Sequence, residues 1–327
     1  MTARAFFGRK STWLGFVLAC AVALQANAWP ERAVHVIATS PPGGAVDLLA
    51  RIAAEAFGKD FGQPFIVENR PGANGNIGAD LVVKAPADGH TLLVAPPGPF
   101  SINARLMPSM PFDPRRDITP VAMLGVSPLL LVVHPSVAAA DLPQLIAWMK
   151  ARRGRVAYGS QAVGSTGHLA MELFKELAGV EATHVPYKGS SAQATADLLA
   201  GRVALAFVNT STTLAYVRSG RLRAIAVAEK TRIASAPDVP TLDEAGMPGF
   251  EATPWIGLGA RAGISPEVTR ALNASVARAL ARAEVIERLR DAGIESRPMT
   301  PDAFAAFVAA ETEKWSEIIR RSGAKAE

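Results

Sequence analysis

The chain has 327 residues, of which 34 are Lys or Arg and 29 are Asp or Glu, giving a formal net charge of +5. With 49% hydrophobic and 19% charged residues, its composition is that of an ordinary globular protein, which excludes the disordered, collagen-like and coiled-coil classes. The length predicts roughly two domains, each large enough to bury its own core.

The N-terminal segment has the three parts of a secretory signal peptide. Three basic side chains lie within residues 1–10, an apolar run spans 13–24, and a small-x-small cleavage site follows at 26–28. The apolar run is shorter than the roughly 20 residues that cross a bilayer, which favours cleavage over an uncleaved anchor. A lipoprotein signal ending at Cys20 is a minor alternative. We predict that residues 1–28 form a signal peptide and that the protein is periplasmic.

Removal of this segment would leave 299 residues with a net charge of +2. Most of the basicity therefore belongs to the export signal, and nothing in the charge favours nucleic acid as a partner. Cys20 is the single cysteine, so the exported chain would have no disulfide and no thiolate metal site. The histidines show no metal-binding spacing, and we predict neither a metal nor a cofactor.

Val- and Ile-rich segments alternate with Ala- and Leu-rich helical segments, which predicts an α/β fold with largely parallel sheets. In chain order, we expect strands at 33–40, 65–68, 91–95, 129–134, 156–158, 183–185, 203–208 and 222–227. The expected helices cover 46–57, 142–150, 169–178, 192–200, much of 266–292 and 301–321. No short repeat stands out.

Two glycine-rich loops, residues 40–47 and 159–168, each connect an expected strand to an expected helix. The first turn of a helix has unpaired N–H groups and a partial positive charge, and glycine lets a ligand approach them. Such a junction is an anion site, and serine and threonine hydroxyls in the second loop would add donors. Gly and Ser also form ordinary turns, so either loop alone could be structural. No nucleotide-binding glycine motif is present.

Several motifs in the same order carry a family resemblance over essentially the whole mature chain. They are Trp29-Pro30-Glu31-Arg32, Pro41-Pro42-Gly43-Gly44, Glu68-Asn69-Arg70-Pro71-Gly72, Asp88-Gly89-His90, Tyr158-Gly159-Ser160, His184-Val185-Pro186-Tyr187-Lys188-Gly189, Pro237-Asp238-Val239-Pro240 and Lys314-Trp315. The chain resembles the Bug receptors, the extracytoplasmic solute-binding proteins of tripartite tricarboxylate transporters.

The resemblance implies a two-lobed periplasmic binding fold, type II-like, that closes on its ligand. Crossings near Leu129 and Glu251 would give a first lobe of residues 29–129 plus 252–327 and a second lobe of 130–251. The implied ligand is a small organic carboxylate held by main-chain N–H groups and water. The implied partners are the membrane permease subunits of a tripartite transporter, and we expect a monomer.

The expected ligand-binding residues follow from the two loops and the resemblance. The first lobe would contribute Pro42, Gly43, Gly44 and Asp47, and the second lobe Ser160, Gly164, Ser165, Thr166 and Asn209. Asp47 has a second interpretation, as an acid in the first turn of a helix paired with Arg51 four residues on.

Three departures from the family pattern bear on the ligand: Ser40 and His90 stand where aromatic residues are common, and residues 96–100 are rich in proline. Phe100 in this stretch predicts an apolar or aromatic ring beside the ligand carboxylate, although a place in the core is the commoner role for such a residue.

Two other function classes remain open. A serine hydrolase is disfavoured because no G-x-S-x-G surrounds Ser160, Ser165 or Ser191, although a triad assembled in space is not excluded. A receptor that signals to a membrane kinase would have the same sequence features. We expect a binding protein and not an enzyme.

Overall fold

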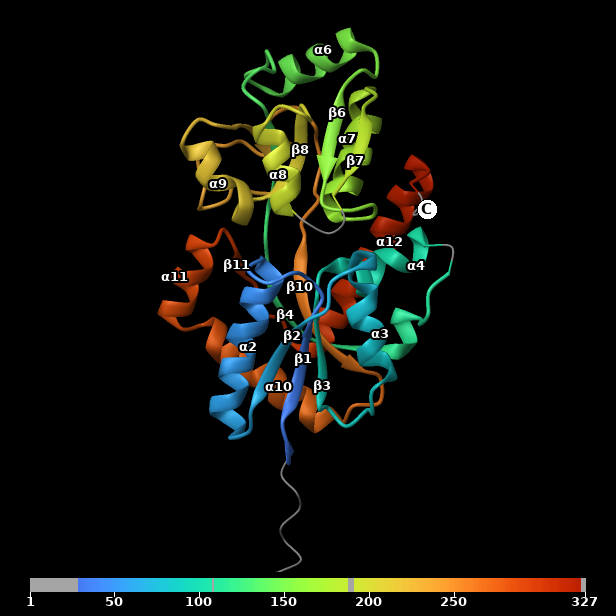
Figure 1. The fold of residues 1–327 in the computed structure, drawn as a ribbon, viewed down its shortest axis with the longest axis vertical. Coiled ribbons are helices and arrows are strands. Elements are labelled where there is room, and N and C mark those ends of the chain that lie inside the picture. The colour runs from blue at the N-terminus through green and yellow to red at the C-terminus, as the bar shows by residue number, and fades with distance from the viewer. Residues whose placement is uncertain (1–28, 108, 188–190, 325–327) are drawn as a thin grey trace, which may run out of the picture.

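The computed structural model describes residues 29–107, 109–187 and 191–324. The predicted signal peptide with Cys20 lies outside this part of the chain, as do Lys188 and Gly189. The described chain forms two sheets, one in each of two stacked bodies that we call the first and second lobes (Figure 1). Helices cover both sheets, so the α/β class is confirmed.

The first lobe is built on a six-stranded sheet of order β11-β4-β10-β3-β1-β2. Its strands are β1 (Val34–Ala38), β2 (Phe65–Asn69), β3 (Thr91–Ala95), β4 (Ile118–Val126), β10 (Trp255–Arg261) and β11 (Glu295–Ser296). The first three run parallel, and β10 is antiparallel to both β3 and β4. Side chains alternate between the two faces of each strand, and both faces of this sheet are covered.

Helices pack on each face of the first sheet. One face carries α2 (Ala45–Phe61), α10 (Pro266–Leu280) and α11 (Ala283–Asp291). The other carries α3 (Asn76–Lys84) and the start of α12 (Pro301–Ser322). The expected helix over much of 266–292 is two helices, because Arg282 adopts an extended backbone between them. The short elements are η1 (Ala73–Gly75), η2 (Gly98–Ile102), α4 (Asn103–Leu106) and α5 (Pro114–Asp117).

The second lobe is built on a five-stranded sheet of order β7-β6-β8-β5-β9. Its strands are β5 (Leu129–Val133), β6 (Ala157–Ser160), β7 (Thr183–Pro186), β8 (Leu205–Asn209) and β9 (Arg223–Val227). The strands β6, β7 and β8 are parallel, and β5 is antiparallel to β8 and β9. Its helices are α6 (Leu142–Arg152), α7 (Thr166–Ala178), α8 (Ser191–Leu199) and α9 (Thr210–Arg218). The cores on its two faces are separate.

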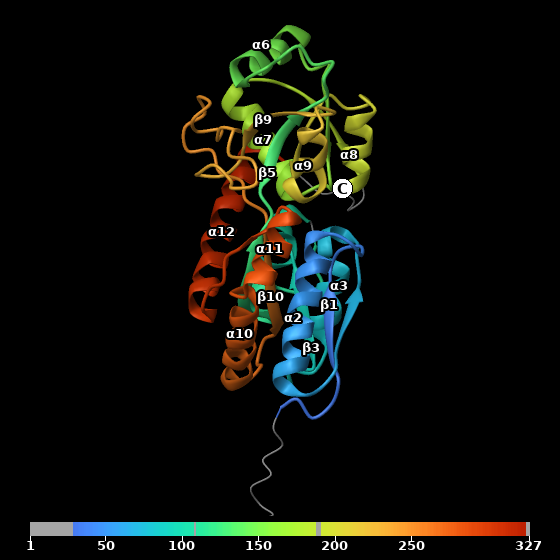
Figure 2. The ribbon, with the colours of Figure 1, turned by 90° about the vertical axis from the view of Figure 1, so that its left-hand side faces the viewer.

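Three segments join the lobes. The chain enters the second lobe between β4 and β5 and returns between β9 and β10, and α12 then runs alongside both lobes (Figure 2). Phe304 near the start of α12 belongs to the core of the first lobe, and Trp315 near its end belongs to the core of the second. Between them, Glu311 Oε2 accepts hydrogen bonds from the indoles of Trp255, at 3.1 Å, and Trp315, at 2.8 Å.

Within the described ranges, the structure contains no helix that is both long and apolar enough to span a bilayer.

Candidate functional site

The two glycine-rich loops lie at the edges by which the lobes face each other (Figure 1). The parallel strands β1, β2 and β3 have their carboxyl ends at one edge of the first sheet, and β6, β7 and β8 have theirs at one edge of the second. Asn74 Nδ2, after β2, donates to the carbonyl oxygen of Gly164 at 3.1 Å and so joins the edges directly. In open α/β sheets, the carboxyl ends of strands are the usual place for a ligand.

The first loop ends at Gly44, the N-cap of α2, which has no side-chain capping bond. The N–H groups of the first turn of α2 are therefore available to an anion, as expected for a strand–glycine loop–helix junction. Pro42 and Gly43 are exposed, and Gly43 has a φ of 85°, in the left-handed region that favours glycine.

Asp47 supports this loop from beneath. One carboxylate oxygen accepts from Gly43 N at 3.0 Å and the other from Asn69 Nδ2 at 2.9 Å, while Arg51 donates to both. Burial raises the pKa of Asp47, but the hydrogen bonds from Arg51, Gly43 and Asn69 outweigh it, so the pKa lies below its ordinary value. The pairing with Arg51 is present, and both carboxylate oxygens are engaged by the protein itself.

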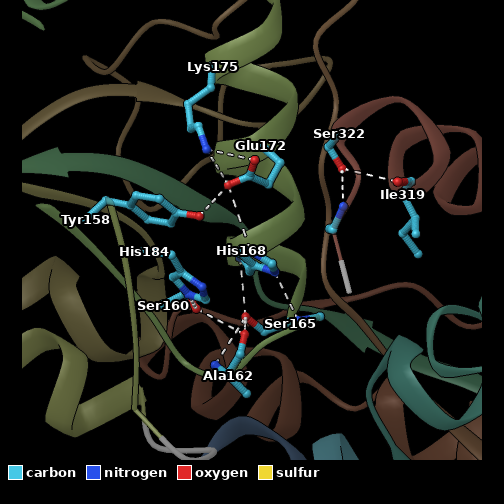
Figure 3. A network of polar contacts seen from close by, with 12 residues as sticks. Tyr158, Ser160, Ala162, Ser165, His168, Glu172, Lys175, His184, Ile319 and Ser322 are labelled. Atoms are coloured by element: carbon cyan, nitrogen blue, oxygen red, sulfur yellow. Dashed lines mark hydrogen bonds and ion pairs between the residues drawn. The ribbon is translucent and has the colours of Figure 1, made fainter. Parts of the chain in front are cut away.

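In the second loop, the serine hydroxyls point inward. Ser160 and Ser165 both donate to the carbonyl oxygen of Ala162, at 3.0 and 2.8 Å, and Ser165 also caps α7 by accepting from His168 N (Figure 3). A hydroxyl has a single hydrogen, so in this arrangement neither serine has one left for a ligand. Thr166 is the exception, because its hydroxyl forms no hydrogen bond with any described residue.

Two histidines that the sequence did not single out as site residues hold the second loop in place. His168 Nδ1 accepts from Gly164 N at 3.0 Å, and His184 Nε2 lies 2.6 Å from Ser160 Oγ. Their rings stack with centroids 4.0 Å apart, and Tyr158 stacks on His184 at 4.9 Å (Figure 3). Since Gly164 N can only donate, His168 Nδ1 has no proton.

Both imidazoles are neutral. Burial lowers the pKa of His168 to about 4 and that of His184 to about 3. Around them, Glu172 Oε1 lies 3.9 Å from His168 Nε2 and accepts from the Tyr158 hydroxyl at 2.6 Å, while Lys175 Nζ lies 2.8 Å from the same carboxylate. This carboxylate favours protonation of His168, but burial outweighs it.

We expect the histidine pair to make the protein less stable in mild acid. The folded-state pKa of His168 lies below the ordinary 6.5, so the unfolded chain binds more protons between pH 6.5 and 4. The free energy of unfolding is therefore highest above pH 6.5 and decreases as the pH falls towards 4. Between pH 7 and pH 5 the free energy of unfolding should fall by about 2 kcal/mol from His168 alone. Urea unfolding at each pH measures this change.

The control is His168→Asn, whose amide oxygen can still accept from Gly164 N but does not titrate. Its free energy of unfolding should depend less on pH than that of the unmodified protein. An equal dependence in both proteins would contradict the assignment to His168.

The other expected positions have different surroundings. Asn209 at the end of β8 donates to the carbonyl oxygen of Ser127 at 3.0 Å, so its amide helps to fix the crossing between the lobes. His90 stands just before β3, at the edge of the first sheet opposite the two loops, and packs against Trp29. The departure from the family pattern at position 90 therefore does not bear on the ligand.

Phe100 requires a correction. Its side chain is 2% exposed, with its ring 5.4 Å from that of Trp255 and 6.0 Å from that of Phe304. The helical turn η2 directs the ring into the core beneath α12, where packing of a large aromatic side chain is most favourable. Phe100 therefore lies in the core and gives no support to an aromatic ligand.

A mainly apolar cavity of about 420 Å³ lies elsewhere between the lobes, beside α11. Its walls include Leu280, Ile286 and Arg290 of the first lobe and residues 234–235 of the second, and it includes none of the expected site residues. Across the described ranges, no three His, Cys, Asp or Glu side chains come together as a metal site would require.

Comparison with known proteins gives concordant results. The sequence model of a family described as "Tripartite tricarboxylate transporter family receptor" matches residues 49–324. Protein BugT of Bordetella pertussis is 40% identical over 306 residues, which cover 93% of this chain and 94% of that protein.

Two solved structures have the same two-lobed fold, which confirms the predicted architecture. A structure described as R. palustris Rpa4515 with adipate has a TM-score of 0.85 and 37% identity, and the match covers 91% of this chain and 99% of that one. MatC from Rhodopseudomonas palustris with bound malate has a TM-score of 0.81 and 32% identity, over 89% and 100% of the two chains.

Proposed function

Because the chain belongs to the family of receptors for tripartite tricarboxylate transporters, we propose that it captures a small aliphatic carboxylate between its lobes and presents it to the membrane permease of such a transporter. The observation that carries the ligand class is the N-terminus of α2, which has no side-chain cap and lies at the edge of the first lobe that faces the second lobe (Figure 1). A carboxylate there would accept from main-chain N–H groups and interact favourably with the helix dipole.

The contacts would come mainly from the backbone. Gly44 and the first turn of α2 would bind one carboxylate group, with Pro42 and Gly43 beside it. On the second lobe, the Thr166 hydroxyl would face the ligand, and Asp47, Ser160, Gly164, Ser165 and Asn209 would keep the two loops in shape. The adipate and malate bound to similar proteins are aliphatic dicarboxylates, which supports an aliphatic acid as the ligand.

The wider setting follows from the same proposal. The lobes would divide as residues 29–129 plus 252–327 and 130–251, with the end of α12 packed on the second lobe. Residues 1–28 would direct export to the periplasm, where the protein would act as a monomer without catalysis. Closure of the lobes on the ligand would remove water from it and create the surface that the permease recognises.

Calorimetry with adipate, malate and benzoate tests this function. We expect one molecule of an aliphatic dicarboxylate to bind per chain and benzoate to bind far more weakly. At a ligand concentration of 100 Kd, binding stabilises a protein by about 2.7 kcal/mol, so Tm should rise by about 4 °C.

The acid should be recovered unchanged after prolonged incubation, as measured by NMR. Turnover would indicate an enzyme, and benzoate binding in preference to both aliphatic acids would contradict the assigned ligand class.

A further inference from the structure

The connection between β2 and α3 has an unusual backbone. Gly72, Ala73, Asn74 and Gly75 have successive φ values of 121°, 47°, 50° and 92°. Among the described residues, Ala73, Asn74 and Arg153 are the three non-glycine residues with positive φ. Left-handed conformations cost roughly 1–2 kcal/mol for residues other than glycine and persist only where surrounding contacts hold them. The contacts that hold this connection therefore indicate what it does.

One hydrogen of the Asn74 side-chain amide holds the connection to its own lobe. Asn74 Nδ2 donates to Asn103 Oδ1 at 2.7 Å, and Asn103, which is fully buried, donates in return to the carbonyl oxygen of Asn74 at 3.1 Å. Asn103 also donates to Asn76 Oδ1 at 2.7 Å. A chain of three amides thus fixes the position of Asn74 Nδ2.

The other hydrogen of the amide crosses to the second lobe, where it meets the carbonyl oxygen of Gly164 at 3.1 Å. Gly164 is in turn held by its own lobe, because its N–H donates to His168 Nδ1. Both ends of the cross-lobe bond are therefore fixed, and the bond can form only when the lobes are close together.

We propose that Asn74 is a positioning residue that holds the lobes closed and so slows ligand release without itself contacting the ligand. This inference rests on the proposed function. It gives the Asn74 side chain, on the first lobe, a hydrogen bond that forms only when the loop of residues 159–168 on the second lobe has moved into place. The strained backbone of residues 73–74 is what directs the amide across the interface.

Asn74→Gly tests the proposal, because glycine adopts this backbone conformation without strain and removes only the amide. With whichever of adipate and malate binds the unmodified protein, we expect the dissociation rate to rise about tenfold and the association rate to change less than twofold, by stopped-flow measurement. Aspartate also tolerates the left-handed region but lacks the amide donor, so Asn74→Asp should raise the dissociation rate as Asn74→Gly does.

The matched control is Asn273→Ala. Asn273 Nδ2 also bridges two groups, the carbonyl oxygens of Val121 and Met299 at 2.9 and 2.7 Å, but both belong to the first lobe. Its loss should lower Tm and leave the dissociation rate unchanged.

A second measurement needs no ligand. Spin labels at Lys59→Cys on α2 and Lys150→Cys on α6 report the distance between the lobes, and we expect Asn74→Gly to reduce the closed population in the ligand-free protein. If neither acid binds, the proposed function fails and the distance measurement still tests Asn74. An unchanged distance distribution, or an unchanged dissociation rate with slower association, would overturn the inference.

Discussion

Gly164→Val is expected to weaken the binding of the acid at least 100-fold, the largest loss of affinity that we anticipate from a single substitution. A Cβ atom at this position would overlap Cδ2 of Leu106, a side chain of the first lobe that is buried in the core of the second. Because Leu106 is tightly packed, it has little room to move aside, and the two γ-methyl groups of valine increase the overlap. The lobes would therefore be held apart.

The backbone of Gly164 adds a second effect, since its φ is 74° and valine is strained there. This strain should lower Tm by a few degrees even in the ligand-free protein. Gly179→Val separates the two effects. Gly179 ends α7 with a φ of 60°, and a Cβ there would meet nothing within 4 Å.

In calorimetry, Gly179→Val should lose similar stability and keep its affinity, whereas Gly164→Val should lose both. A Gly164→Val protein that bound the acid within threefold of the unmodified protein would show that Leu106 does not limit closure.

Glu311→Ala is expected to cause the largest loss of stability. The indole N–H groups of Trp255 and Trp315 donate to the same carboxylate oxygen, and both residues are fully buried. Without the carboxylate, two buried donors lose their acceptor, at roughly 1–3 kcal/mol each. The loss should total about 3–5 kcal/mol and lower Tm by about 5–8 °C, as measured by calorimetric unfolding.

Glu311→Gln keeps an amide oxygen as acceptor and should restore most of the stability. Glu313→Ala, two residues away, removes a carboxylate that is 74% exposed and pairs with Arg115, and should change Tm by less than 2 °C. A Tm for Glu311→Ala close to that of Glu313→Ala would contradict the role given to this carboxylate.

Much of the fold follows from local pattern. The parallel strands β1, β2 and β3 and the helix after the first glycine loop were predicted within a few residues, because each has a short apolar run followed by a turn signal. The strands β4 and β10 were not predicted. They pair with each other across more than 120 residues of sequence, and Pro120 and two glycines of β10 obscure the strand pattern.

The site could be predicted only in outline. Glycine and serine spacing located both loops, but the partners of the Ser160 and Ser165 hydroxyls, the carbonyl of Ala162 and the imidazole of His184, are set by how the loop folds. The role of Asn74 likewise depends on Gly164, 90 residues further along the chain. The contacts of Asp47 could be predicted in part. Its ion pair with Arg51, four residues on, follows from helical spacing, whereas its hydrogen bond with Asn69, on the next strand, does not.

The course of α12 has a consequence for how the lobes can move. Two flexible crossings alone would allow both bending and twisting about the line between them. A rigid rod anchored by Phe304 at one end and Trp315 at the other resists torsion, because twisting would shear its packing against one lobe or the other. We therefore expect opening to be mainly a rotation about one axis, which a single distance between the lobes would follow.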